Sequence, residues 1–167
     1  SNGNLLINED NFPSANFRQY ISETFDSEGA GYLTEEQVLA VTVIDCNERA
    51  INNLKGIEYF TALEKLNCSY NQLSSLDLSA NTALTTVNSS GQSIDAEAYW
   101  DIEACLVDLG AIVGAANIDK VVSVTGGSYN SSTGIVTLDS PAEGTIEISY
   151  IYNTQAPVTD NGMTVHV

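Results

Sequence analysis

The chain has 167 residues, which is enough for one compact domain or two small ones with a sizeable hydrophobic core. Its 22 acidic and 5 basic residues give a formal net charge of −17, which argues against nucleic acid or an anionic membrane surface as a partner. No apolar run is long enough to insert into and span a membrane, and 3 cysteines are an odd number that does not indicate a disulfide framework.

Two short helices joined by a loop are predicted at the N-terminal end. The aromatic and aliphatic residues of the segment 12–25 keep a helical spacing, and Ser14 is a typical N-cap residue for that helix. A second helix is predicted from Thr34, because TEEQ (Thr34 to Gln37) has the spacing of a capping box. We therefore expect residues 1–40 to form a helical cap on the segment that follows.

The loop between these helices, DSEGAGYLTEEQ, resembles the twelve-residue calcium loop of an EF-hand. Asp26 opens the loop and Gly31 supplies its sharp turn. Two ligand positions fail, because Ala30 has no side-chain oxygen and Gln37 replaces the bidentate glutamate that closes such loops. We predict an EF-hand-like cap with no cofactor. If calcium does bind, its candidate ligands are Asp26, Glu28, Tyr32 and Gln37.

A repeat occupies residues 41–94. Leu63 recurs as Leu84 at a spacing of 21 residues, and Cys68 corresponds to Cys46 with one extra residue. The template L-x-x-L-x-C-x-x-N-x-L-x-x-L is the leucine-rich-repeat pattern, in which each unit adds one short strand to a stacked solenoid. We predict about three units. The residues expected to point inward in the second unit are Leu63, Leu66, Cys68, Leu73, Leu76 and Leu78.

Asn71 and Cys68 of this repeat have structural interpretations. Asn71 follows the strand, where its side-chain amide can bond backbone groups that the turn leaves unpaired. Cys68 holds an inward strand position, so we interpret it as a buried thiol that packs as a small hydrophobe. A disulfide with Cys46, expected about 4.8 Å away on the next strand, is the alternative. Neither a metal site nor a catalytic thiol is indicated, since the chain has only 1 histidine and no evident base partner.

Residues 95–119 are predicted to connect the repeats to the C-terminal part of the chain. The run from Asp95 to Leu109 has apolar residues at helical spacing, so we expect a helix capped by Asp95. Glu97 and Asp101 would share the outer face of that helix. A solvated face explains them better than an acid–base pair does.

Residues 120–167 alternate apolar and polar side chains between clusters of turn residues, which predicts a small antiparallel β unit against the last repeat. Tyr150 and Tyr152 are two positions apart and so share a face, where strand packing is expected; a sugar-stacking platform with Tyr129 is the alternative. The overall prediction is an α+β fold. The predicted core residues of the β unit are Val122, Val124, Ile135 or Val136, Ile146, Ile148, Tyr150, Tyr152, Met163 and Val165.

The stretch INNLKGIEYFTALEKLNCSYNQLSSLDLSANTALTTVN closely resembles the cysteine-containing leucine-rich repeats of secreted bacterial surface proteins similar to the internalins. Only Leu63 to Ala83 matches the repeat unit fully. FDSEGAGYLTEEQVLAV resembles the EF-hand-like cap of that family, and the tail that begins IDKVVSVTGG resembles the small β unit that often follows its repeats. The resemblance implies an extracellular or cell-surface protein without catalytic activity, used for adhesion or protein recognition.

The resemblance also implies a binding site on the concave face of the strands, for a protein or a glycan at the cell surface. Three strands give a patch only about 15 Å wide, so a spacer domain without a ligand of its own is the alternative. We expect a monomer. No catalytic residues are predicted, since neither a paired carboxylate site nor a nucleophile with a base is recognisable and His166 is interpreted as a strand residue. By alternation, the outward residues of this face are Val43, Asp45, Asn47, Lys65, Asn67, Ser69, Thr86, Asn88 and Ser90.

Overall fold

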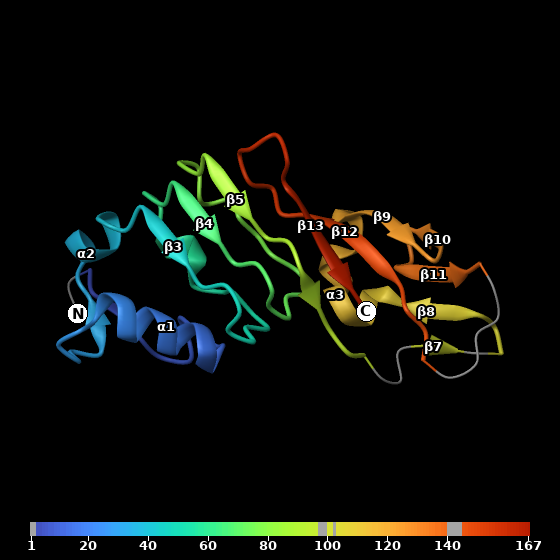
Figure 1. Ribbon diagram of the computed structural model, residues 1–167, viewed down its shortest axis with the longest axis horizontal. Helices are drawn as coiled ribbons and strands as arrows, with labels where there is room; N and C mark the ends of the chain where they lie inside the picture. Colours follow the sequence, from blue (N-terminus) through green and yellow to red (C-terminus); the bar gives the residue numbers. More distant parts are fainter. Residues whose placement is uncertain (1–2, 97–99, 102, 140–144) are drawn as a thin grey trace.

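The computed structural model of the protein describes residues 3–96, 100–101, 103–139 and 145–167. The molecule is elongated, with two helices at its N-terminal end, three parallel strands in the middle and two four-stranded sheets at the other end (Figure 1). The fold therefore mixes helices and sheets, in agreement with the predicted α+β class. No helix among the described residues is both long and apolar enough to cross a membrane.

The N-terminal segment forms the two predicted helices, α1 (Ala15–Phe25) and α2 (Glu35–Leu39). The Ser14 hydroxyl accepts a hydrogen bond from the backbone N–H of Phe17, and Thr34 and Gln37 form the predicted capping box. Both N-terminal caps are confirmed. Two short strands, β1 (Leu5–Leu6) and β2 (Tyr32–Leu33), pair antiparallel and hold the start of the chain against the loop between the helices.

The repeat segment forms three parallel strands, β3 (Val43–Asp45), β4 (Lys65–Asn67) and β5 (Thr86–Asn88), with a 3-10 turn η1 (Ile57–Tyr59) after the first strand. Their register follows the repeat, because paired positions are those that correspond in the 21- and 22-residue spacings. The six inward residues predicted for the second unit are all buried.

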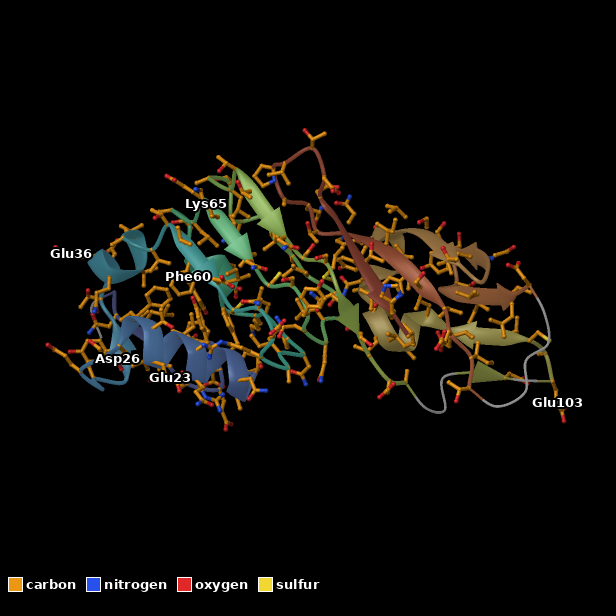
Figure 2. The ribbon with its side chains drawn as sticks, viewed as in Figure 1. Glu23, Asp26, Glu36, Phe60, Lys65 and Glu103 are labelled. Carbon is orange, nitrogen blue, oxygen red and sulfur yellow. The ribbon has the colours of Figure 1, made fainter. Side chains whose placement is uncertain are left out.

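Aromatic side chains join α1 to the first repeats. Phe12 makes an edge-to-face contact with Phe17, and the ring of Phe60 lies 6.1 Å from that of Phe25. Phe60 is labelled in Figure 2 between α1 and the parallel strands. Such aromatic pairs contribute about 0.5–1.5 kcal/mol each beyond the apolar area that they bury. The helical segment thus covers the N-terminal end of the hydrophobic core.

Asn71 satisfies the backbone groups at the end of β4, as predicted. Its Nδ2 donates to the carbonyls of Cys46 and Cys68 at 3.0 Å, and its Oδ1 accepts from the backbone N–H groups of Arg49 and Ile51 at 3.0 Å. Gln92 takes the corresponding position in the third unit. Its side chain bonds the backbone of residues 68, 73 and 89 in the same manner.

Among the described residues, the C-terminal part forms two four-stranded sheets, in which the β6–β13 pair alone is parallel. The chain also contains a short helix α3 (Leu109–Val113) and a 3-10 segment η2 (Ala115–Lys120). The first sheet has the order β6 (Gln92–Ser93), β13 (Gly162–His166), β12 (Ser149–Asn153) and β9 (Val121–Thr125). The second has the order β10 (Gly127–Asn130), β11 (Ile135–Leu138), β8 (Leu106–Asp108) and β7 (Trp100–Asp101).

The last repeat is continuous with these sheets. β6 belongs to the third repeat unit and pairs directly with β13 near the C-terminal end of the chain. The Tyr150 hydroxyl on β12 donates a 2.6 Å hydrogen bond to the carbonyl of Ser74, and the Leu78 N–H donates to the carbonyl of Thr154 at 2.8 Å. The β unit therefore lies against the last repeats, as expected.

The helix predicted from Asp95 to Leu109 is wrong for the described residues. Residues 100–101 and 106–108 form β7 and β8, which pair with each other and, through β8, with β11. Helical spacing was misleading here because partners distant in sequence decide the conformation of a short apolar segment. Glu97 lies outside the described residues. Asp101, with which it was predicted to share a helical face, lies in strand β7.

One predicted core residue is also wrong. Val122 is 61% exposed, whereas Val121 is buried. The pairing of β9 with β12 shifts between Ile151 and Tyr152, so that Val122 is an extra residue in the ladder. A bulge of this kind interrupts the alternation on which the prediction depended. Tyr150 and Tyr152 are each only 1% exposed, which confirms the packing interpretation and excludes them from a sugar-stacking surface.

Candidate functional site

The candidate site is the outward surface of β3, β4 and β5, here called the strand face. The register sets its predicted residues in two rows across the strands: Val43, Lys65 and Thr86 in one, and Asp45, Asn67 and Asn88 in the other. Ile44, Leu66 and Val87 alternate with these rows and point inward. Figure 2 shows Lys65 on the side of the strands away from α1.

Eight of the nine predicted residues reach the surface of the strand face. Asn47 and Asn67 are half-buried, and six others are exposed, among them Val43 at 55%. Ser69 is the exception, because it is only 2% exposed. Its carbonyl accepts from Glu48 N–H and its hydroxyl donates to Asn67, so this serine lies inside the turn between neighbouring units.

Both asparagines of the second row have their side-chain oxygens engaged. Asn67 Oδ1 accepts from the N–H and hydroxyl of Ser69 at 3.1 and 2.6 Å. Asn88 Oδ1 accepts from the N–H and hydroxyl of Ser90 at 3.2 and 2.7 Å. Within the described part of the chain, neither Nδ2 group has a hydrogen-bond partner. The strand face therefore presents two amide donors on adjacent strands.

Tyr70 is a surface residue that the sequence analysis missed. It stands at the end of β4 with a positive φ of 54° and is 61% exposed. The corresponding residues of the neighbouring units, Glu48 and Gly91, also have positive φ, at 54° and 71°. The signal available in the sequence was an aromatic residue directly before Asn71, with a glycine 21 positions later.

The cysteines of the repeat are core residues. Cys46 and Cys68 are free thiols with no exposed surface, so the disulfide alternative is excluded. Burial, with a smaller effect of the Asp45 charge, raises the pKa of Cys46 to about 12. Burial likewise raises the pKa of Cys68 far above its ordinary value. Both thiols stay protonated near neutral pH and lack the thiolate character that a nucleophile needs.

The EF-hand-like loop is closed by protein groups. Asp26 Oδ1 accepts from Ala30 N–H at 2.9 Å, and Asp26 Oδ2 accepts from Gly31 N–H at 2.8 Å. Gln37 Oε1 accepts from Thr34 N–H at 2.8 Å. The first and last candidate calcium ligands thus already bond the backbone, and Glu28 and Tyr32 are exposed. No group of three His, Cys, Asp or Glu residues in the described ranges is placed to hold a metal ion.

A hollow of about 470 Å³ at the end of the first C-terminal sheet gathers titratable side chains. His166, Asp95 and Glu147 line it, together with the hydroxyl residues Ser93 and Ser149. His166 is paired with Ser93 and Ser149 on the neighbouring strands, as expected for a strand residue. Across the described residues its imidazole makes no hydrogen bond to a carboxylate or hydroxyl.

Comparison with known proteins gives a partial match. The chain is 41% identical to internalin J of Listeria monocytogenes serotype 4b over 71 residues, and 40% identical to that of serovar 1/2a. This match covers 42% of the chain but only 8% of internalin J. No family model matches the sequence. The resemblance to internalin-like bacterial surface proteins is thus confirmed over part of the chain.

Solved structures extend this comparison. The functional domain of internalin J, which includes a cysteine ladder, is 32% identical over 56% of this chain and 19% of that protein, with a TM-score of 0.44. The CBM51-2 and INT domains of ZmpB from Clostridium perfringens, solved in complex with GlcNAc, cover 98% of this chain, with 36% of that chain matched, a TM-score of 0.53 and 15% identity. The second likeness shows a shared fold alone.

Proposed function

We propose that the chain is a non-catalytic recognition or adhesion module of an extracellular or cell-surface protein, and that it binds a protein or glycan through the strand face. The observation that carries this proposal is the register of β3, β4 and β5. It aligns Lys65 with Thr86 and Asn67 with Asn88 into a continuous polar surface. The partial match to internalin J supports the same assignment.

The finer architecture is part of this proposal. We interpret residues 41–94 as a short leucine-rich-repeat solenoid, residues 1–40 as its EF-hand-like cap and residues 120–167 as its C-terminal β unit, acting as a monomer. The shared register, the capped helices and the antiparallel strands support this division. Since β8 pairs with β11 and β7 pairs with β8, these two strands of the connecting segment extend that unit.

A binding screen with matched variants tests the proposal. The purified chain would be screened against cell-surface proteins and glycans, together with the triple variant Lys65→Ser, Asn67→Asp and Asn88→Asp. These changes keep an oxygen in each asparagine turn while they remove one cation and two donors. The control triple variant makes the same change in charge at exposed positions within the first repeat unit, between β3 and η1, with the substitutions Asn52→Asp, Asn53→Asp and Lys55→Ser.

Binding that the first triple variant loses and the control retains is the expected result. A ligand that binds both variants equally would contradict a role for the strand face. The alternative function is a rigid spacer, and the small width of three strands favours it, since about 15 Å is little for a stable protein interface. A folded chain without any partner in the screen would support the spacer.

A further inference from the structure

Tyr70 is held in a fixed place at the edge of the strand face. Its backbone N–H donates to the carbonyl of Ser90 at 2.9 Å, which attaches it to the third repeat unit. The backbone N–H of Ser90 in turn donates to the side-chain oxygen of Asn88, the last residue of β5. The Tyr70 backbone therefore lies next to Ser90, two residues after Asn88, and Tyr70 is the most exposed aromatic residue in the described ranges.

Gly91 lies directly against the ring of Tyr70. A Cβ atom added at Gly91 would lie 2.6 Å from Tyr70 Cδ1 and 2.7 Å from Cε1, much closer than such atoms approach. The ring thus fills the space that a side chain at position 91 would take. One side of it rests on Gly91 while the rest of the residue faces solvent, so the aromatic surface is positioned before any ligand arrives.

The side-chain amides of Asn67 and Asn88 can act toward a partner only as hydrogen-bond donors. Because Ser69 and Ser90 occupy the Oδ1 atoms of Asn67 and Asn88, only the Nδ2 groups can bind a partner. A partner must therefore offer acceptor oxygens, such as those of hydroxyl, ring, acetamide or carboxylate groups. Tyr70, Asn67, Asn88 and Ser90 carry no charge, although the chain as a whole has a net charge of −17.

These features together describe a carbohydrate surface. An exposed aromatic ring packs against the apolar face of a sugar, and amide donors beside it bond the sugar oxygens. The patch is about 15 Å wide, which is small for a protein partner but sufficient for one or two sugar rings. The acidic chain repels anionic ligands. We propose that Tyr70, Asn67 and Asn88 form a subsite for a neutral pyranose of a glycan chain, with Gly91 as a positioning residue.

This inference rests on the proposed function and names its ligand class. The test is an NMR titration of the ¹⁵N-labelled full chain with glucose, galactose, mannose, N-acetylglucosamine, N-acetylgalactosamine and their disaccharides. The anionic sugars N-acetylneuraminic acid and glucuronic acid form a comparison arm. The expected result is a saturable shift of the Asn67 and Asn88 side-chain amides and of the Gly91 N–H with at least one neutral sugar, and none with the anionic pair.

Four variants assign the effect to the subsite. Tyr70→Ala should weaken binding roughly tenfold, whereas Tyr70→Phe should retain it because the ring surface remains. Asn88→Asp keeps the oxygen that accepts from Ser90 but loses the donor, and should weaken binding several-fold. Tyr32→Ala removes an exposed tyrosine from the N-terminal cap and should leave binding unchanged.

Two results overturn the subsite. One is the absence of a saturable shift with any neutral sugar, and the other is binding that persists unchanged in Tyr70→Ala. If the sugars fail but a protein ligand is lost in the triple variant at Lys65, Asn67 and Asn88, the recognition function stands and the partner is a protein. If the triple variant also retains every ligand, both proposals fail.

Discussion

The repeat segment and the C-terminal β unit are built on different relations between sequence and space. In the repeat, strands that lie side by side come from positions 21 or 22 residues apart, and Asn71 and Gln92 serve the same purpose in the second and third units. In the β unit, β6 pairs with β13 across most of the remaining chain, and Tyr150 bonds Ser74 over 76 residues. Residue spacing therefore predicts which strands pair in the repeat, whereas it does not predict the strand pairing of the β unit.

This contrast predicts where single changes cost most. In the repeat, one buried side chain often completes the backbone bonding of two neighbouring units. In the β unit, large side chains such as Tyr150 and Tyr152 are buried in the core. The largest effect should accordingly come from the hydrogen-bonding ladder of the repeat.

Asn71→Ala should have the largest effect on stability. The substitution leaves the carbonyl of Cys46 and the N–H groups of Arg49 and Ile51 without their partner, while the carbonyl of Cys68 keeps its hydrogen bond from Gln92 Nε2. Buried groups that lose their hydrogen bonds cost about 1–3 kcal/mol each when water cannot replace the partner, so we expect a loss of about 3–5 kcal/mol. Urea denaturation followed by circular dichroism measures it.

Asn53→Ala is the matched control for that experiment. Asn53 is exposed and makes one local hydrogen bond, to the N–H of Lys55. Its substitution should cost at most about 1 kcal/mol. Equal losses for the two variants would show that the Asn71 ladder is not what stabilises the repeat.

Alkaline pH should destabilise the β unit through Tyr152. Burial, followed by the charges of Asp77 and Asp119, raises the pKa of this phenol from 10.0 to about 12. Because the folded state disfavours the phenolate, the stabilisation is complete below pH 10 and is lost as pH rises through about 12. We expect Tyr152→Phe to lower the loss of stability over that interval by about 2 kcal/mol.

The measurement is a series of urea denaturation curves between neutral pH and pH 12, with Tyr70→Phe as the variant that removes a surface hydroxyl. The free energy of unfolding of Tyr152→Phe should fall less steeply than that of the wild type, and that of Tyr70→Phe should follow the wild type. Parallel curves for Tyr152→Phe and the wild type would assign the alkaline transition to other groups, such as the buried thiol of Cys46.

Asp26→Asn should weaken the cap by about 1–2 kcal/mol, since the amide can replace only one of the two acceptors that bind Ala30 and Gly31. The same interpretation predicts that calcium leaves the melting temperature of the wild type unchanged. Thermal denaturation with calcium and with a chelator checks both statements. Glu28→Gln, on the exposed part of the loop, is the control and should have little effect. A calcium-dependent rise in melting temperature that Asp26→Asn abolishes would show that the loop is a metal site.

How far the sequence predicts this molecule follows from the same comparison. Periodicity located the strands, the inward residues and most of the strand face, because neighbours in a repeat are set by spacing alone. It failed at Ser69 and Tyr70, since the positive φ of Tyr70 ends the strict alternation of a strand. It also failed from Asp95 to Leu109, where pairing with β11 decides the structure.

The cap shows a third limit. The sequence indicated that Ala30 offers no side-chain oxygen and that Gln37 lacks the two charged oxygens of the closing glutamate, but it did not indicate what closes the loop instead. Asp26 does so by accepting two backbone N–H groups, a role that no spacing rule distinguishes from that of a metal ligand. The bulge at Val122 is similar, because it depends on the partner strand β12 and not on the local pattern.

The smallest expected effect concerns the contact between Tyr70 and Gly91, where the repeat departs from strict repetition. Gly91→Ala should cost about 1–2 kcal/mol, from a side chain at a φ of 71° and from displacement of the tyrosine ring. Only the second part involves Tyr70. In the Tyr70→Ala background the cost of Gly91→Ala should therefore fall by about 0.5–1 kcal/mol, measured by a double-mutant cycle in urea. A coupling energy of zero would show that the ring moves aside freely, and Gly91 would then position nothing. A coupling in the expected range would mean that the aromatic surface is fixed by the fold before it meets a ligand.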